Sequence, residues 1–485
     1  MAKESLRGKT VKGASWSLID SLSNQGISFL VGLVLARLLT PEEYGLIGIV
    51  TIFIAVFNSI VDSGFSNALI RKHDAKDIDY NTVFIANLVI SVVLFFVLFF
   101  ASSFVADFFK QPLLERLLQV MASIIIINAF AIIQRTKLVK CIDFKTQTKI
   151  SLIASVTSGV LGIGMAFGGY GVWSLVGQQI SRQLLNSIFL WVFSKWYPRF
   201  QFSWDSFREL FGFGWKLLVS GLIDTAWKEI YQVVIGKYYT PATLGQYTRA
   251  KEFGRIFSSN LTAVIQRVSY PVLSAIQNDK ERLKHAYRRV IKVTMLGTFV
   301  LMLGLAAVSK PMIQVLVGDQ WLMAAKLLPI ICLQMMLYPL HSLNLNMLQV
   351  QGRSDLFLKL EIIKKCVAVI PVLLGIFVGI YWMLWGSVCT GFFAYYLNSY
   401  YSGKLLNYSI LAQIKDILPS FIVAAIMATI TYLVSLLPLS PFFLLPLQLV
   451  VGFTLTILLC EWFRLEEYRE LKGMVLSVLH KIIHR

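Results

Sequence analysis

The sequence has few charged residues, no GxxxxGK[ST] motif and no CxxC pair. Charged residues make up 15% of its 485 residues, whereas a soluble globular protein carries about 25%. No GxxxxGK[ST] phosphate-binding loop occurs, so no ATP-hydrolysing site is expected. The five cysteines include no CxxC pair, so neither a disulfide framework nor a metal site is indicated.

Apolar residues are abundant instead, at 56% of the chain, and the mean hydropathy is +0.68. Runs of about twenty apolar residues recur, and each is long enough to cross about 30 Å of hydrocarbon. The sequence therefore predicts an all-α polytopic membrane protein with about fourteen transmembrane helices. The expected spans are 14–38, 44–69, 81–106, 113–134, 147–168, 171–193, 212–236, 245–272, 290–309, 322–349, 358–379, 381–402, 415–436 and 441–462.

The net charge of +19 is distributed unevenly between alternate loops. Basic residues crowd one set of loops, among them the loop expected to begin at Arg135, and this asymmetry marks the cytoplasmic side. Both termini are then cytoplasmic, and the basic residues do not form a nucleic-acid-binding face. The N-terminus lacks an A-x-A cleavage site, so the first span is expected to be retained. The opposite loops receive only Arg37, Lys110, Arg116, Lys237, Lys310 and Lys326.

The loops between the expected spans are short on both sides of the membrane. None is long enough to house the catalytic domain of an enzyme, so a non-enzymatic protein is expected. The tail 463–485 carries apolar residues at helical spacing between lysines and arginines. It is expected to be an amphipathic segment on the cytoplasmic membrane surface.

One short motif occurs twice, at Thr40-Pro41 and at Thr240-Pro241, 200 residues apart. Each copy joins two apolar segments, with a threonine suited to cap the second helix, a proline suited to its first turn, and a glycine four residues after the proline. Thr-Pro is a common cap, so chance is the alternative to duplication. Duplication predicts two membrane lobes with a site between them. The expected division is 1–200 and 201–405 for two six-helix lobes, 406–462 for two extra helices, and 463–485 for the tail.

Polar residues recur every three to four positions on four of the spans, which places them on one helical face. Charged side chains facing lipid cost several kcal/mol, so these faces should point to protein or water. The stripes include Asp20 and Asn24 in the first span, Asp62 in the second, Asp224 and Lys228 in the seventh, and Arg249, Lys251 and Arg255 in the eighth.

Two interpretations of these stripes stay open. Structural roles are one: Asp224 and Lys228 could form an internal ion pair, neighbouring Ser and Asn could satisfy Asp20 and Asp62, and the basic residues of the eighth span could extend to the membrane surface. A cavity between the lobes is the other. Its net positive charge would suit an anionic group such as a phosphate. The substrate-binding candidates are then Lys228, Arg249, Lys251, Arg255 and Asn24, and the coupling-ion candidates are Asp20, Asp62 and Asp224.

Several of these segments carry a family resemblance, which covers roughly residues 8–460. They are the two Thr-Pro motifs with their flanks (36–45 and 240–247), Asp62-Ser63-Gly64-Phe65-Ser66-Asn67-Ala68-Leu69-Ile70, and Val268-Ser269-Tyr270-Pro271-Val272-Leu273. The sequence resembles the oligosaccharide flippases of the multidrug/oligosaccharidyl-lipid/polysaccharide (MOP) exporter superfamily, and within it the Wzx-type lipopolysaccharide and O-antigen exporters.

The resemblance implies two six-helix lobes in a V and alternating access in the bacterial inner membrane. It implies an undecaprenyl-pyrophosphate-linked glycan as substrate, the surrounding membrane lipids as partners, and other polysaccharide-assembly proteins as further ones. Related flippases of lipid-linked cell-wall precursors keep charged groups on their first, second and eighth helices. This chain departs from them, because its first helix has no deep Arg or Lys.

Two other functions compete with this one. A multidrug or cation antiporter of the same superfamily should have an acidic or aromatic pore, which the basic eighth span disfavours. A membrane glycosyltransferase or polymerase should have a sizeable extracytoplasmic loop, and none is present. No cofactor is expected. The coupling ion (Na⁺ or H⁺, with the membrane potential as a further energy source), the glycan and the oligomeric state are not fixed by the sequence.

Overall fold

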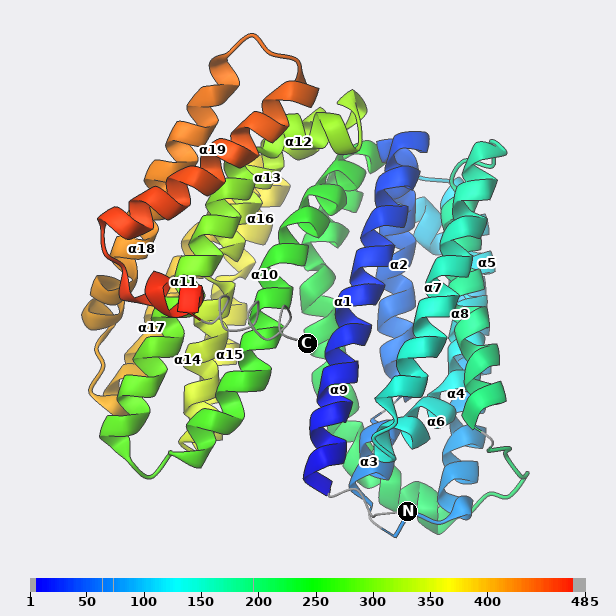
Figure 1. The fold of residues 1–485 in the computed structure, drawn as a ribbon. Coiled ribbons are helices and arrows are strands. Elements are labelled where there is room, and N and C mark those ends of the chain that lie inside the picture. The colour runs from blue at the N-terminus through cyan, green and yellow to red at the C-terminus, as the bar shows by residue number, and fades with distance from the viewer. Residues whose placement is uncertain (1–5, 63, 73, 195, 474–485) are drawn as a thin grey trace, which may run out of the picture. The chain divides into compact units, whose positions relative to one another are not determined.

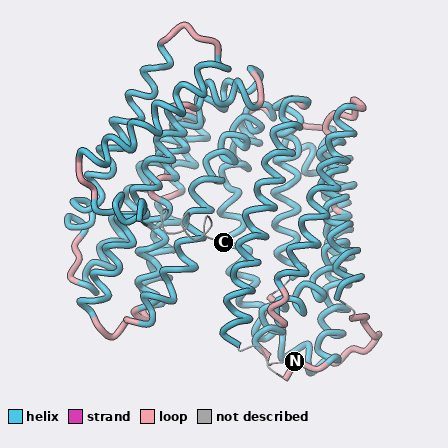
Figure 2. Tube along the Cα trace, viewed as in Figure 1, coloured by secondary structure: helices cyan, strands magenta, loops and turns pink. Residues whose placement is uncertain are grey.

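Residues 6–62, 64–72, 74–194 and 196–473 are described by a computed structural model of the chain. All regular secondary structure among these residues is helical (Figure 2). The expectation of an all-α fold is confirmed. The physical reason is that long apolar segments satisfy every backbone hydrogen bond internally only as helices or closed barrels.

The chain divides into two compact units, Met1–Thr248 (unit 1) and Arg249–Arg485 (unit 2). This division falls inside α10 (Pro241–Ala275), because α9 (Trp204–Tyr238) packs on α2, α3 and α4 of the first unit. The lobe boundaries expected at 200/201 and 405/406 stay predictions.

Unit 1 is built from helices that connect through short turns (Figure 1). Its long helices pack side by side with partners near and far along the chain: α7 lies against both α1 and α8, and α6 lies against α4 and α8. The helices that precede α9 are α1 (Leu6–Leu38), α2 (Pro41–Asp62), α3 (Phe65–Arg71), α4 (Asp77–Phe109), α5 (Leu113–Met121), α6 (Ser123–Lys140), α7 (Phe144–Phe167) and α8 (Trp173–Ser194).

Unit 2 holds the rest of α10 and the helices that follow it (Figure 1). Its central contact joins α11 to α18, and α19 covers α18 and α12. The helices are α11 (Lys280–Ala307), α12 (Ser309–Leu316), η1 (Asp319–Trp321), α13 (Leu322–Met335), α14 (Tyr338–Val350), α15 (Ser354–Val367), α16 (Val369–Phe377), α17 (Ile380–Leu406), α18 (Ile410–Leu433), η2 (Val434–Leu436) and α19 (Pro441–Trp462).

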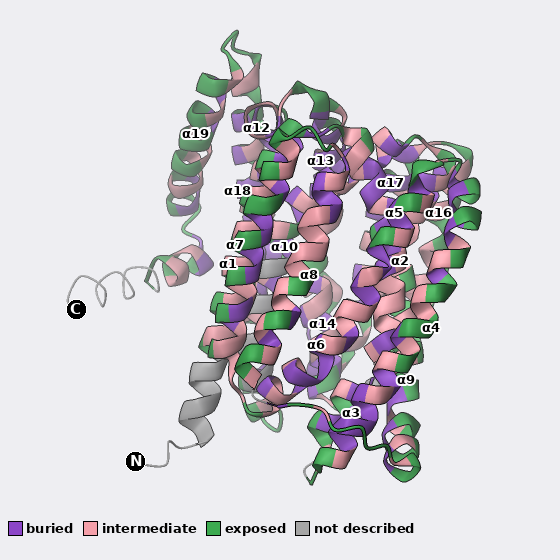
Figure 3. Cartoon of the chain, turned by 90° about the vertical axis from the view of Figure 1, so that its right-hand side faces the viewer, coloured by how far each residue is buried: buried purple, intermediate pink, exposed green. Residues whose placement is uncertain are grey.

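Every expected span overlaps a helix, and nine helical segments within the described residues are long and apolar enough to cross a membrane. The expectation of a polytopic membrane protein is confirmed, while the number fourteen stays a prediction. The expected spans 171–193, 212–236, 245–272, 358–379 and 381–402 are not among these nine segments. Two of them, 212–236 and 245–272, carry polar stripes. α4 carries exposed residues on its surface (Figure 3). Among them are Phe96, Phe100 and Phe104, which are 50%, 75% and 75% exposed.

The two Thr-Pro motifs form the helix starts that the sequence predicts. Thr40 Oγ1 accepts a hydrogen bond from the Glu43 amide at 3.3 Å, and Glu43 Oε2 accepts one from the Thr40 amide at 2.7 Å. These reciprocal bonds form a capping box at the start of α2. Thr240 Oγ1 likewise accepts from the Thr243 amide at 3.2 Å at the start of α10.

The two motifs also contact each other within unit 1, and the contact is reciprocal. A Cβ atom added to Gly45 would lie 1.8 Å from the carbonyl oxygen of Pro241, and one added to Gly245 would lie 1.8 Å from the carbonyl oxygen of Pro41. Reciprocal contacts of this kind are typical of two copies that are related by a local twofold axis. The contact therefore favours duplication over chance.

The tail forms a helix over the described residues 466–473. Leu465, Tyr468 and Leu471 pack on a cluster of α11, α18 and α19 side chains that includes Val423 and Cys460. The apolar residues at helical spacing therefore contact the protein itself. Residues 474–485 lie outside the described residues, and the expected membrane-surface location stays a prediction.

Candidate functional site

The polar stripe of the first span forms a hydrogen-bonded cluster with α7. Asn24 Nδ2 donates to Asp20 Oδ1 at 2.7 Å and to Ser151 Oγ at 2.8 Å, and Asn24 Oδ1 accepts from Ser155 Oγ at 2.6 Å. Ser151 also donates to Asp20. A glycine lets the helices approach, because a Cβ added to Gly159 would meet Val31 at 2.5 Å.

This cluster bears on the two interpretations of Asp20. Its carboxylate accepts hydrogen bonds from Asn24 and Ser151, as the structural interpretation expects. The same atoms bring carboxylate, amide and hydroxyl oxygens together beside the candidate span Ser15–Leu38, and hard cations prefer such oxygen ligands. Within the described part of the chain, no group of three or more His, Cys, Asp or Glu side chains could hold a metal ion. The coupling-ion role of Asp20 stays a prediction.

Arg182 on α8 is a charged residue that the sequence analysis missed. Its Nη1 donates to Ser28 Oγ at 3.2 Å, and its charge interacts with that of Asp20. The signal was present in the sequence, because Arg182 is the only charged residue of the expected span 171–193. An intramembrane arginine points to a functional site by default.

A second polar site surrounds Asp62, where a cavity of about 530 Å³ opens between α2, α3, α6 and α9. Asp62 Oδ1 accepts hydrogen bonds from the Ser66 amide at 3.3 Å and from Ser66 Oγ at 2.5 Å. Across the cavity, Asn128 Nδ2 donates to Asn58 Oδ1 at 3.1 Å. Asp62 is thus bonded to a neighbouring serine and also lines a polar cavity.

Arg135 lines the same cavity, and its position corrects the sequence analysis. The loop-charge pattern placed Arg135 at the start of a cytoplasmic loop, but α6 continues as far as Lys140. Its guanidinium interacts electrostatically with both Asp62 and Asp20. Arg135 lies seven residues after Asn128 and hence on the same helical face, which was the overlooked signal.

The candidates on α9 form the ion pair that the sequence left open. Lys228 Nζ lies 2.6 Å from Asp224 Oδ2, and the two side chains are 68% and 52% exposed. An exposed pair of this kind is worth at most about 1 kcal/mol. Both groups therefore remain accessible, and their roles in substrate and ion binding stay predictions.

The basic residues of α10 differ from one another in their surroundings. Arg249 is only 6% exposed, and its guanidinium carbon lies 5.5 Å from the ring centre of the buried Trp321. This cation–π contact gives Arg249 a packing role. Arg255 is half exposed and directs its guanidinium at Glu252, with nitrogen–oxygen distances of 2.7 and 3.1 Å. Lys251 lies one turn before Arg255 on the same unbroken helix and is half-buried.

The structure places Asp20 with Asn24 in unit 1, Asp62 with Arg135 in unit 1, and Lys251 with Arg255 in unit 2. Polar faces on the helices of an all-helical fold with many apolar spans are typical of a membrane transporter. Residues 34–326, more than half of the chain, match the profile of the family described as polysaccharide biosynthesis protein. The chain belongs to this polysaccharide biosynthesis protein family.

Two characterised bacterial proteins illustrate the relationship. The chain is 26% identical over 329 residues to the succinoglycan biosynthesis transport protein ExoT of Rhizobium meliloti (strain 1021), which is 68% of this chain and 67% of that protein. It is 24% identical over 378 residues to the lipopolysaccharide biosynthesis protein WzxC of Escherichia coli (strain K12), which is 76% of each chain.

Solved structures show the same fold. A lipid II flippase MurJ in an inward closed conformation superposes with a TM-score of 0.75 at 16% identity, over 94% of this chain and 99% of that one. An inward-facing multidrug resistance MATE family transporter of the MOP superfamily superposes with a TM-score of 0.60 at 16% identity, over 79% of this chain and 94% of that one. These likenesses confirm the fold that the resemblance implies.

Proposed function

We propose that the chain flips an undecaprenyl-pyrophosphate-linked oligosaccharide from the cytoplasmic to the outer leaflet of the bacterial inner membrane, by alternating access, for cell-surface polysaccharide assembly. Membership of the polysaccharide biosynthesis family supports the substrate class. The observation that carries the proposal is Arg135, an arginine of α6 that lines a polar cavity of about 530 Å³ beside Asp62 and Asn128.

The chemistry of this cavity fits a pyrophosphate. A guanidinium group offers a fork of N–H donors that matches phosphate oxygens, and Asn58 and Asn128 offer neutral polar contacts beside it. Lys251 and Arg255 of unit 2 are proposed as substrate-binding cations in their own right. The first helix has no deep Arg or Lys. Arg135 on α6 provides a positive charge in unit 1 instead.

The energy source is proposed to be an ion gradient acting through Asp20 or Asp62. Each carboxylate belongs to an oxygen-rich polar cluster and interacts with Arg135. Binding of a cation would compete with Arg135 for these carboxylates and would free the guanidinium for phosphate. The membrane potential alone remains the competing source, and a transport assay with imposed gradients separates the two.

Restoration of surface polysaccharide in a strain that lacks its own flippase tests the function. Wild-type protein should restore it, while Arg135→Ala should fail at an equal level of membrane protein. Arg116 on α5 is exposed, so Arg116→Ala is a matched control that should restore it fully. Efflux of cationic dyes without restoration of polysaccharide would instead establish the multidrug antiporter.

A further inference from the structure

A cavity of about 550 Å³ lies in unit 2 where α11 and α18 begin and α19 ends. α11 contributes Lys284, Arg288 and Lys292, which share one helical face because they are four residues apart. α18 contributes Lys415, and Arg464 projects from the turn that follows α19. Five cationic side chains from three segments therefore line one cavity.

One carboxylate in the wall of the cavity has both oxygens hydrogen-bonded to protein groups. Asp416 is only 7% exposed, and the Arg288 guanidinium donates to both of its oxygens at 2.5 Å. The Tyr408 hydroxyl donates to the same carboxylate at 2.7 Å. Asp416 therefore neutralises Arg288 and leaves no free oxygen to bind a cation.

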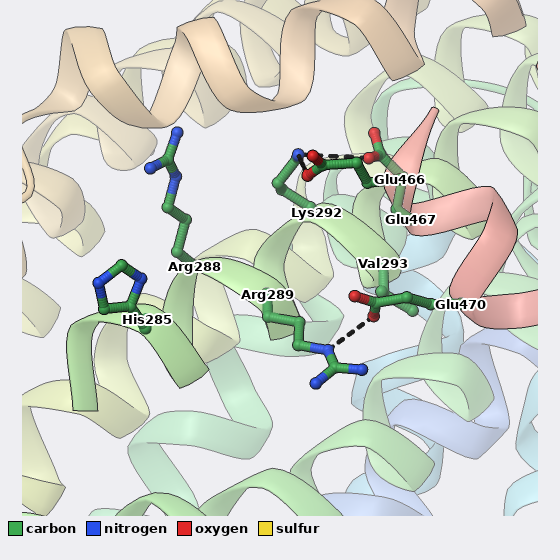
Figure 4. A pocket seen from close by; sticks show the side chains of 8 residues that line it. All are labelled: His285, Arg288, Arg289, Lys292, Val293, Glu466, Glu467 and Glu470. Carbon is green, nitrogen blue, oxygen red and sulfur yellow. Dashed lines mark hydrogen bonds and ion pairs between the residues drawn. The ribbon is translucent and has the colours of Figure 1, made fainter. Parts of the chain in front are cut away.

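The tail supplies the other carboxylates, and these are paired too. Lys292 Nζ lies 3.3 Å from Glu466 and 3.4 Å from Glu467, and Glu467 is only 3% exposed. In an adjoining hollow of about 460 Å³, Arg289 contacts Glu470 at 2.7 Å (Figure 4). These contacts fix the tail helix against α11, so the cavity has a defined wall.

Three cations remain after this pairing. Lys284, Lys415 and Arg464 form no ion pair with any residue that the structure describes, and the latter two are exposed. The cavity therefore presents positive charge that the protein does not neutralise. An anion with several oxygen acceptors, such as a phosphate, fits this chemistry.

The surroundings favour a phosphate that is attached to an apolar body. On α18, Leu411 and Leu418 are 75% and 45% exposed, and at the end of α19, Trp462 and Phe463 are 80% and 47% exposed. Tryptophan concentrates at the boundary between hydrocarbon and water. Apolar surface for acyl chains thus lies beside a basic hollow for a headgroup.

We propose that this cavity binds the phosphate of an anionic phospholipid, whose acyl chains lie along α18 and α19. Basic pockets at the ends of transmembrane helices recognise anionic headgroups in this way. Bound lipid would join α11, α18 and the tail through one headgroup. The site is separate from the transport residues proposed above, so its failure would leave the proposed function standing.

The test titrates the purified full-length chain in detergent with phosphatidylglycerol and with phosphatidylcholine, reading bound lipid by native mass spectrometry and the midpoint of thermal unfolding. Phosphatidylglycerol should bind and raise the midpoint, and phosphatidylcholine should not. The variant Lys284→Gln/Lys415→Gln/Arg464→Gln should bind phosphatidylglycerol at least about tenfold more weakly. Its matched control removes the same charge from exposed residues elsewhere in unit 2, and is Arg282→Gln/Lys310→Gln/Lys359→Gln.

The possible results of this test distinguish a phospholipid headgroup from free inorganic phosphate. Loss of phosphatidylglycerol binding in the cavity variant, with wild-type binding in the control, supports the proposal. Displacement of the lipid by millimolar inorganic phosphate would show a site for the free ion and would overturn the assignment to lipid. Equal binding by both variants, or equal binding of phosphatidylcholine, would also overturn it.

Discussion

Replacing Gly45 by alanine should destabilise the protein, although alanine is normally the better helix former. The added Cβ would lie 1.8 Å from the carbonyl oxygen of Pro241, and real Cβ atoms essentially never come within 3.0 Å of another heavy atom. The two helix starts must therefore move apart by about 1 Å. No rotamer change relieves the contact, because the backbone fixes the position of the Cβ and its partner is a backbone carbonyl oxygen. Overpacking of this kind costs about 3 kcal/mol.

The higher helix propensity of alanine offsets about 1 kcal/mol of this cost, so the free energy of unfolding falls by about 2 kcal/mol. For a unit of 248 residues this corresponds to a fall of about 4–8 °C in the midpoint of thermal unfolding. The assay is thermal unfolding of the purified protein in detergent. Gly26→Ala on α1 is the control, because nothing lies within 4 Å of its added Cβ, and it should be neutral or stabilising.

The reciprocal contact also predicts how Gly245→Ala and the double variant should behave. Gly245→Ala should cost as much as Gly45→Ala, because the two contacts are equivalent. The double variant should cost clearly less than the sum, since one separation of the helix starts relieves both clashes. Wild-type stability in either single variant, or full additivity in the double, would refute the reciprocal contact of the two motifs.

Three further predictions concern transport and topology. Asp62→Asn should reduce transport more than it reduces stability, measured under an imposed ion gradient, and unchanged transport would remove Asp62 from the mechanism. Arg255→Ala should weaken substrate binding roughly ten- to a hundredfold. Arg255→Lys should keep only part of the transport activity, and full activity of this variant in the complementation assay would indicate that Arg255 only extends to the membrane surface. Reporter fusions at Arg485 and near Lys76 should be cytoplasmic and one near Gly169 should not, and a periplasmic Arg485 would overturn the expected topology.

Local structure could be predicted from the sequence because its causes are local. The caps of Thr40 and Thr240 follow from residues within one turn, and both are observed. The contact between the two motifs could not be predicted, since it joins residues about two hundred positions apart. In the structure, the glycine of each motif leaves room for the proline carbonyl of the other.

The candidate site could be predicted only where its residues lie on one helix. Periodicity placed Asp20 and Asn24 on one face, and they are hydrogen-bonded. Their partners Ser151 and Ser155 come from a different helix, so spacing could not reveal them. Arg135 was misplaced because loop-charge counting treats every arginine near a helix end as exposed.

The most direct test of the central claim is flipping by the purified protein in liposomes. A fluorescent undecaprenyl-pyrophosphate-linked oligosaccharide is placed in the bilayer, and its exposure on the far leaflet is followed with a membrane-impermeant quencher. Wild-type protein and Arg116→Ala should flip the lipid, and Arg135→Ala should not, at equal levels of folded protein. Flipping by Arg135→Ala at the wild-type rate, or no flipping by the wild type under any ion gradient, would contradict the account.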